Sequence, residues 1–376
     1  MKKFCIFCGK PPINKNKEHL LPKWLIEMTG DPNRSGTFGP FLNNTALEIK
    51  EIPFNQFVLP ACYKCNYEFG VKIGARAKLI LRKLLEEKPL SMNDFNLLLS
   101  WIDKIRIGSG LSTLYYLKNP YKTTPPNYII DGAMTRDRML LIFKSKQEFK
   151  GLNVFGIGTN FIINYPICIG LIINNYGFIS ISKTFLLHKA FGLPFPQIDP
   201  IFLKVNSSDN YEVMFIKGPN VMSYPIFDYD YNFECTEIFQ PILSNNILKD
   251  NIQARVFYGN SRYNYIFGKK TSLLGRIFYR DNLEIKKYPE QKSKIWKPNE
   301  LDLDMGSFQS YIAFHTIQIQ NSFIKSGLKL SKEITSSTKL LLKSILEINN
   351  LNLSRLPLFK RREYLKKSQN IAQKKD

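Results

Sequence analysis

The chain has 376 residues, of which 44% are apolar, and it carries 53 lysines and arginines against 31 acidic residues. This length predicts two or three domains, and the apolar content is that of a globular protein. The net charge of +22 attracts polyanions, so nucleic acid is the expected partner and an anionic membrane surface is the second possibility. The alternative is a solubility charge in an organism whose coding favours Lys, Asn and Ile.

The sequence lacks the patterns of a secreted or membrane protein. Met1-Lys2-Lys3 is followed by cysteines and lysines and not by an apolar signal segment. The most apolar stretch, residues 153–182, is interrupted by several asparagines and a proline, so it cannot cross a bilayer as a helix. Four of the six cysteines form two CxxC pairs, which favours a metal site over a disulfide framework. We therefore expect a cytoplasmic protein without a membrane partner.

The first elements after the amino-terminal turn are short. Pro22 and Gly30 delimit a predicted helix, since proline suits a first helical turn and glycine ends one. Residues 31–39 are rich in Pro, Gly, Asn and Ser and are expected to form a loop. Residues 47–52 alternate apolar and charged side chains, which predicts a strand, and residues 54–59 are expected to return beside it.

Longer helices are predicted further along the chain. The apolar spacing favours one helix over residues 63–87, and another begins after Ser91, with Asp94 placed to complete its cap. Gly108-Ser109-Gly110 can bend this second helix before it ends near residue 117. A third helix is expected within residues 332–349, followed by a basic tail.

Strands are expected to dominate the middle of the chain. The segments 140–143, 161–165, 168–173 and 177–182 are rich in Ile, Phe and Tyr. Asn174-Asn175-Tyr176-Gly177 predicts a hairpin turn between the last two segments. The expected fold class is α+β, with a zinc-stapled module at 1–88, a helical connector at 89–125, a mainly β basic domain at 126–330, and a helix and basic tail at 331–376.

The two CxxC pairs predict a structural zinc ion. Cys5 and Cys8 precede a Gly-Pro-rich turn of the zinc-knuckle type, and Cys62 and Cys65 follow after a long insertion. Zinc prefers four such ligands at tetrahedral geometry. Because a site closed by four thiolates has no open position, this ion is expected to hold the fold and to perform no chemistry.

The residues around these pairs resemble the HNH endonucleases. In that family, CxxC pairs flank a motif like Glu18-His19-Leu20-Leu21-Pro22, and the second pair is followed by an asparagine, here Asn66. The resemblance covers about residues 1–85. It implies a ββα-metal core of the treble-clef type, in which a hairpin carries the histidine and a helix starts near the second pair.

The resemblance also implies roles for individual residues. His19 would be the general base that activates water, Glu18 would help to hold a magnesium-type ion, and Asn66 would orient the histidine segment or approach the metal. The reaction would be hydrolysis of phosphodiester bonds, with DNA favoured over RNA. The whole chain is similar to HNH-type proteins of bacterial anti-phage defence, which implies a protein partner that controls the enzyme.

One position departs from the family pattern. Related sequences place a Glu or His about eight residues after the asparagine, where this chain has Gly74. Glu68 is no obvious replacement, because it lies about 240° away around a regular helix. Either His188 or His315 completes the site, although both lie among apolar residues typical of a core, or a water fills it. The remaining alternative is a degenerate module that binds zinc and nucleic acid without cutting.

Two groups of cations are candidates for phosphate binding. Lys72 and Arg76 lie on the helix predicted at 63–87, where an ordinary solvated face is the alternative. The second group is a basic run between residues 269 and 297 with interleaved aromatic residues, for which an exposed strand edge is the alternative. Its candidate ligands for phosphate are Lys269, Lys270, Arg276 and Arg280.

Overall fold

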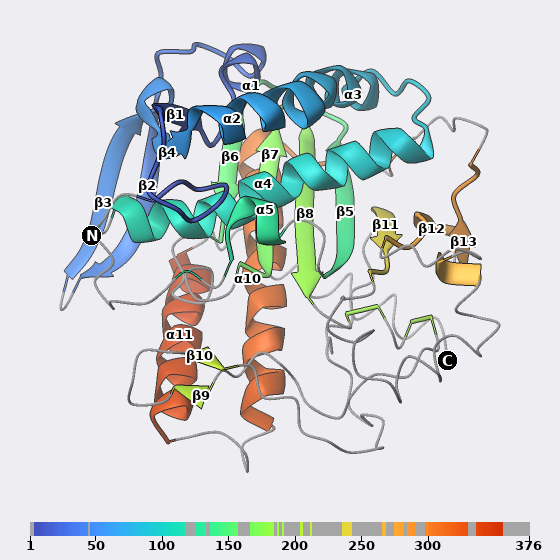
Figure 1. Cartoon of the computed structure of the whole chain (residues 1–376). Helices are drawn as coiled ribbons and strands as arrows, with labels where there is room; N and C mark the ends of the chain where they lie inside the picture. The colour runs from blue at the N-terminus through green and yellow to red at the C-terminus, as the bar shows by residue number, and fades with distance from the viewer. Residues whose placement is uncertain are drawn as a thin grey trace, which may run out of the picture.

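The structure is a computed structural model, and it combines helices with a large antiparallel sheet (Figure 1). It describes residues 4–43, 46–116, 125, 127–132, 136–156, 166–183, 186–187, 190–191, 204–205, 211–212, 235–242, 265–267, 274–281, 284–290, 298, 300–329 and 336–355. The predicted strand at 161–165 and the basic tail beyond residue 355 lie outside these ranges. No helix in the described ranges is long and apolar enough to cross a membrane.

An eight-stranded sheet forms the centre of the molecule. Its order is β13-β12-β11-β5-β8-β7-β6, and neighbours in this path are antiparallel, whereas β14 pairs with β5 in parallel. The strands are β5 (Asp137–Ser145), β6 (Leu152–Phe155), β7 (Cys168–Ile173), β8 (Tyr176–Lys183), β11 (Thr236–Gln240), β12 (Phe278–Asp281), β13 (Glu284–Lys287) and β14 (Glu300–Leu301). The predicted turn at Asn174 is confirmed, because it joins β7 to β8 and Asn174 has a positive φ of 53°.

Both faces of the sheet are buried. Along β5, Leu140 and Ile142 belong to one apolar cluster, whereas Met139 and Leu141 belong to another on the opposite face. Successive side chains of a strand point to opposite faces, so a strand covered on both sides needs apolar residues at nearly every position. This requirement explains the continuous apolar segments in the sequence.

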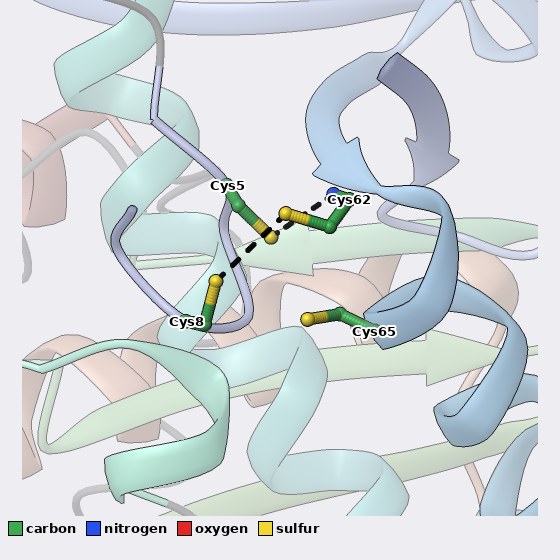
Figure 2. A group of neighbouring side chains, drawn as sticks. All are labelled: Cys5, Cys8, Cys62 and Cys65. Carbon is green, nitrogen blue, oxygen red and sulfur yellow. Dashed lines mark hydrogen bonds between the residues drawn. The ribbon is translucent and has the colours of Figure 1, made fainter. Parts of the chain in front are cut away.

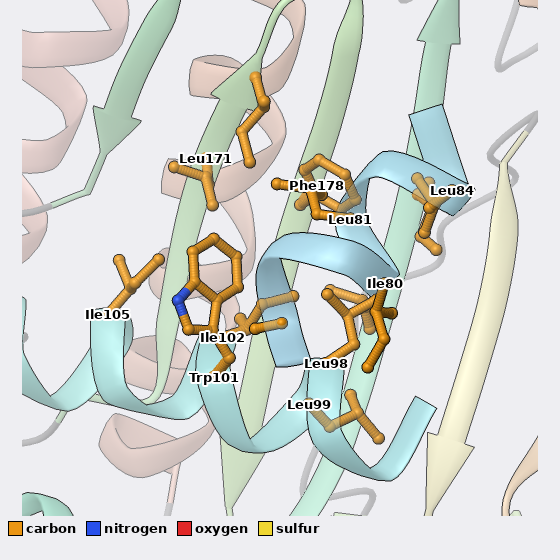
Figure 3. Close-up of a cluster of buried hydrophobic side chains, with 14 of the residues drawn as sticks. Ile80, Leu81, Leu84, Leu98, Leu99, Trp101, Ile102, Ile105, Leu171 and Phe178 are labelled. Atoms are coloured by element: carbon orange, nitrogen blue, oxygen red, sulfur yellow. The ribbon is translucent and has the colours of Figure 1, made fainter. Parts of the chain in front are cut away.

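Helices α3 (Ala75–Leu85) and α4 (Met92–Tyr116) cover one face. Figure 3 shows Ile80 and Leu84 of α3 with Trp101 of α4 among the side chains packed above Leu171 and Phe178 of the sheet. The predicted cap of α4 is confirmed by reciprocal hydrogen bonds between Ser91 and Asp94. The apolar core is therefore continuous across residue 88.

Helices α10 (Met305–Lys329) and α11 (Ser336–Arg355) lie on the opposite side of the sheet (Figure 1). The helix predicted at 332–349 is confirmed by α11. The region predicted as mainly β, residues 126–330, also contains the long helix α10, which was not predicted. That helix buries Thr316 and Gln320 beside its apolar residues, which obscures its periodicity in the sequence.

The amino-terminal part is built on an antiparallel pair of strands, β1 (Lys15–His19) and β4 (Val58–Cys62). The intervening chain forms a second antiparallel pair, so the predictions of a loop at 31–39 and of a return strand at 54–59 beside 47–52 were wrong. Its elements are α1 (Lys23–Met28), β2 (Ser35–Asn43), β3 (Ala46–Pro53) and the short 3₁₀ turn η1 (Phe54–Gln56).

The helix predicted at 63–87 is present with one interruption. It consists of α2 (Tyr63–Phe69), a π-helical turn η2 (Gly70–Gly74) and α3. π-turns within α-helices occur frequently at functional sites. The remaining described elements are α5 (Ile129–Gly132), β9 (Lys204–Val205) and β10 (Tyr211–Glu212).

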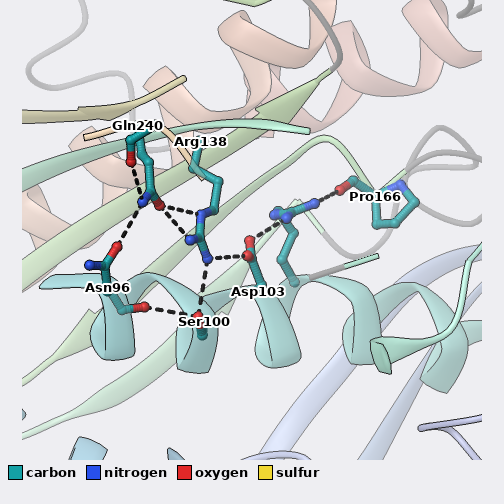
Figure 4. A network of polar contacts seen from close by, with 8 residues as sticks. Asn96, Ser100, Asp103, Arg138, Pro166 and Gln240 are labelled. Carbon is teal, nitrogen blue, oxygen red and sulfur yellow. Dashed lines mark hydrogen bonds and ion pairs between the residues drawn. The ribbon is translucent and has the colours of Figure 1, made fainter. Parts of the chain in front are cut away.

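A buried polar network joins α4 to the sheet (Figure 4). Asp103 of α4 accepts hydrogen bonds from Arg106 and Arg138, and Arg138 also donates to Gln240 of β11. All four side chains are almost fully buried. Buried guanidinium groups require such partners, so this network fixes how α4 sits across the strands.

Candidate metal centre and histidine site

The four cysteines of the CxxC pairs come together, as predicted (Figure 2). Their Sγ atoms all lie within 4.8 Å of one another, and the Sγ atoms of Cys8 and Cys62 are 4.0 Å apart. Four thiolates at about 2.3 Å from a zinc ion, in tetrahedral geometry, are about 3.8 Å apart. The cluster therefore fits a structural zinc ion.

Two different local structures bring the pairs together. Cys5 and Cys8 lie in a tight turn closed by a hydrogen bond of 2.8 Å from Gly9 N–H to the Cys5 carbonyl. Gly9 has a φ of +72°, and a Cβ at this position would overlap the Tyr128 ring, so only glycine fits. The second pair begins at Cys62, the last residue of β4, and continues into the first turn of α2.

The surroundings of the sulfurs suit thiolate ligands. The backbone N–H of Cys62 donates to Cys5 Sγ at 3.2 Å, and the N–H of Ile13 donates to Cys62 Sγ at 3.3 Å. Burial, together with contacts to the other thiols, raises the pKa of Cys65 to about 12. A bound divalent cation reverses this effect, because its charge stabilises the thiolate form. The cluster thus supplies four ligands for a metal ion, whose charge would stabilise their thiolate form.

The histidine lies on β1, which pairs with β4, the strand that ends at Cys62. Glu18 and His19 end β1 and pair with Leu59 and Val58 of β4. The side-chain amide of Asn66, in α2, donates to the carbonyl of Lys17 at 3.4 Å. This hydrogen bond ties the helix that starts at the second cysteine pair to the strand that carries the histidine.

Lys104 of α4 is part of the site, although the sequence analysis did not identify it. Its ammonium group forms an ion pair with Glu18, donates to the His19 carbonyl at 2.9 Å, and lies 5.7 Å from the centre of the Phe69 ring. The Lys104 side chain is only 2% exposed. The available signal was three charged residues, Asp103, Lys104 and Arg106, alternating with large apolar residues in one helix, since charges buried there need partners from elsewhere in the fold.

Gly108 explains how α4 approaches this strand. A Cβ on Gly108 would overlap the Leu20 side chain, which follows His19 directly. The helix α4 continues through residues 108–110 to Tyr116 without a break. The glycine serves close packing, which brings Lys104, one turn earlier on α4, within reach of Glu18.

His19 is held in its neutral form. Burial and the positive charge of Lys23 lower its pKa, against the opposing charge of Glu18. The Nδ1 atom is buried and has no hydrogen-bond partner in the described part of the chain. A neutral imidazole has one nitrogen that can accept a proton, which is the property that a general base needs. Because Nδ1 is buried, Nε2 would have to be the nitrogen that meets a water molecule.

A catalytic divalent ion does not fit this arrangement. The carboxylate of Glu18 is paired with the Lys104 ammonium, and Gly74 at the end of η2 contributes no ligand. His315 lies on α10, where its ring contacts the rings of Tyr311 and Phe314. Because α10 and α4 pack on opposite faces of the sheet, His315 does not complete the site. His188 lies outside the described residues. A Cβ at Gly74 would approach no other atom closer than 3.9 Å, so the glycine is not required for packing.

The predicted phosphate-binding cations have different environments. Lys72 and Arg76 are exposed on η2 and α3. Arg276 forms an ion pair with Glu290 at 3.5 Å, and Arg280 forms one with Glu237 at 2.9 Å, so both have acidic partners. Tyr288, one of the interleaved aromatic residues, is buried, and Lys269 and Lys270 lie outside the described residues.

We compared the chain with models of protein families, with curated proteins and with solved structures. None of them matches.

Proposed function

We propose that the protein is an HNH-type endonuclease, which hydrolyses phosphodiester bonds, most readily in DNA. In this proposal β1, β4 and α2 form a ββα-metal module stapled by a zinc ion on Cys5, Cys8, Cys62 and Cys65. The observation that carries the proposal is the hydrogen bond from Asn66 to the Lys17 carbonyl. It connects the helix of the cysteine cluster to the strand of His19, as the resemblance to HNH enzymes predicts.

In this mechanism His19 is the general base. Its lowered pKa keeps the imidazole neutral near pH 7, so it accepts a proton from water as the water oxygen attacks phosphorus. The bond from phosphorus to the leaving oxygen then breaks, and that oxygen takes a proton from solvent. A magnesium ion would stabilise the leaving oxygen in the resembled family. Since Glu18 is paired with Lys104, we assign no step to such an ion.

A second candidate function is nucleic-acid binding without cleavage. It is favoured by the ion pair between Glu18 and Lys104, which occupies the carboxylate that a catalytic ion would need. Gly74 also favours binding without cleavage, because it has no side chain that could act as a ligand. In either case, the resemblance alone supports a role in anti-phage defence with a controlling protein partner.

A cleavage assay separates the two functions. Zinc-loaded protein is incubated with supercoiled plasmid, single-stranded DNA and RNA, each with Mg²⁺, with Mn²⁺ or with EDTA. His19→Ala removes the base, and Glu27→Ala, at an exposed position on α1, is the matched control. Cleavage by the wild type and by Glu27→Ala, lost in His19→Ala, supports the nuclease. Salt-dependent binding without cleavage under every condition supports the second candidate.

A further inference from the structure

A row of large side chains lies exposed along α2, η2 and α3. Tyr63, Tyr67, Val71 and Leu79 are 56%, 61%, 55% and 59% exposed. These four residues, which we call the tyrosine face, occupy one continuous helical segment at the surface (Figure 1). Single exposed apolar residues are ordinary on a protein surface, but several along one helical segment, two of them in ring contact, are typical of a binding site.

The two tyrosines have the geometry of a stacking platform. Their ring centroids are 6.2 Å apart, and the ring planes are inclined by only 9°. They are separated by four residues, about one helical turn, so both rings project from the same side of α2. Because each ring is more than half exposed, a planar group from solvent can stack on them.

Cations flank the tyrosine face. Between residues 63 and 85 the chain carries six lysines and arginines and a single acidic residue, Glu68. Glu68 is shared by Lys64 and Lys72, whereas Arg76 and Arg82 form no ion pair within the described residues. The field at this face is therefore positive, which repels a basic partner and attracts a polyanion.

The tyrosine face lies beside the histidine site. At about 100° per residue, Tyr63 and Tyr67 lie roughly 60° and 100° around α2 from Asn66, on the same side of it. Asn66 is the residue that contacts the strand of His19. The tyrosine face is therefore on the helix that contacts β1, the strand that carries His19.

We infer that the tyrosine face binds single-stranded nucleic acid, with bases stacked on Tyr63 and Tyr67 and phosphates next to Lys72 and Arg76. In a duplex the base faces are covered by neighbouring bases, so they cannot stack on tyrosines, whereas a single strand leaves them free. This inference rests on the proposed function and deepens it, because it names a single strand as the substrate.

Binding to the full-length protein tests the inference without cleavage. Fluorescence anisotropy compares a single-stranded DNA 20-mer, an RNA of the same sequence and the DNA duplex, in buffer without divalent ions. The variant Tyr63→Leu/Tyr67→Leu keeps apolar bulk and removes the rings. Tyr265→Leu is the matched control, because Tyr265 is also 50% exposed but lies in a different part of the chain. Zinc content and melting temperature verify that each variant is folded.

Loss of stacking on two bases is expected to weaken single-strand binding at least tenfold, since each stacked base contributes about 1–3 kcal/mol. Duplex binding should change less than threefold, and Tyr265→Leu should bind as the wild type does. An unchanged single-strand affinity in the double variant would overturn the inference, as would equal losses for duplex and single strand. If the double variant cleaves nucleic acid and binds single strands as the wild type does, only the inference about the tyrosine face is refuted. If single-strand binding depends on the tyrosines but the wild type cleaves nothing, only the nuclease proposal is refuted.

Discussion

The ion pair between Lys104 and Glu18 should contribute strongly to stability. The Lys104 and Glu18 side chains are 2% and 14% exposed, so neither charge can be fully hydrated when its partner is removed. Removing one partner of a buried pair costs about 3–5 kcal/mol. For Lys104→Met we expect a loss of about 3 kcal/mol in the free energy of unfolding, because the partial exposure of Glu18 allows some hydration.

The assay is urea unfolding at pH 7, extended to a double-mutant cycle. Glu18→Gln should cost at least as much as Lys104→Met, because it leaves an ammonium with only the His19 carbonyl and the Phe69 ring. Combining both changes should cost less than the sum of the two by about 2 kcal/mol, since the double variant contains no unpaired charge. Lys146→Met, at an exposed position, is the matched control and should stay within about 0.5 kcal/mol of the wild type.

Two results would refute this reasoning. The first is a loss below about 0.5 kcal/mol in Lys104→Met, which would mean that the ammonium is not desolvated in the folded protein. The second is additivity in the cycle, which would mean that Lys104 and Glu18 do not interact.

Three further predictions concern the rest of the fold. Asp103→Asn should lower the free energy of unfolding in urea titrations by about 3–5 kcal/mol, because it leaves buried guanidinium groups without a counter-charge. A loss below about 1 kcal/mol would contradict a stabilising role of the network. Gly9→Ala should lower stability by about 2 kcal/mol or more because of its positive φ and the Tyr128 ring, whereas Gly151→Ala, in open space, should be close to neutral in the same titrations. Burial lowers the pKa of His315 to about 3, so the unfolded chain binds the extra proton and stability should fall as the pH drops below about 6.5, by up to about 2 kcal/mol at pH 5. His315→Gln should flatten that dependence, and an unchanged slope would contradict it.

Local signals in the sequence predicted the parts of the fold that neighbouring residues determine. The cap at Ser91 and the turn at Asn174 each depend on a few neighbouring residues. Each CxxC pair is also local, whereas the meeting of the two pairs was predicted from the four ligands that zinc prefers. The β1–β4 pairing could be expected only through the resemblance, because its strands are separated by a long insertion.

The features that escaped prediction depend on distant contacts. Lys104 looked like an ordinary helix cation, because its partner Glu18 lies 86 residues earlier in the chain. The helix α10 was missed because it buries polar residues against the sheet, so its apolar spacing is incomplete. The strands at 35–43 and 46–53 pair with each other and not with the central sheet. The first of them therefore lacks the apolar pattern that would have predicted a strand.

Four thiolates are expected to hold one zinc ion, which joins the amino-terminal turn of Cys5 and Cys8 to the end of β4 and the start of α2. X-ray absorption at the zinc edge, combined with elemental analysis of the purified full-length protein, tests it most directly. We expect one zinc per chain with four sulfur neighbours at about 2.3 Å, and loss of the metal in Cys62→Ser. Zinc well below one per chain, or nitrogen and oxygen neighbours in place of sulfur, would contradict the claim.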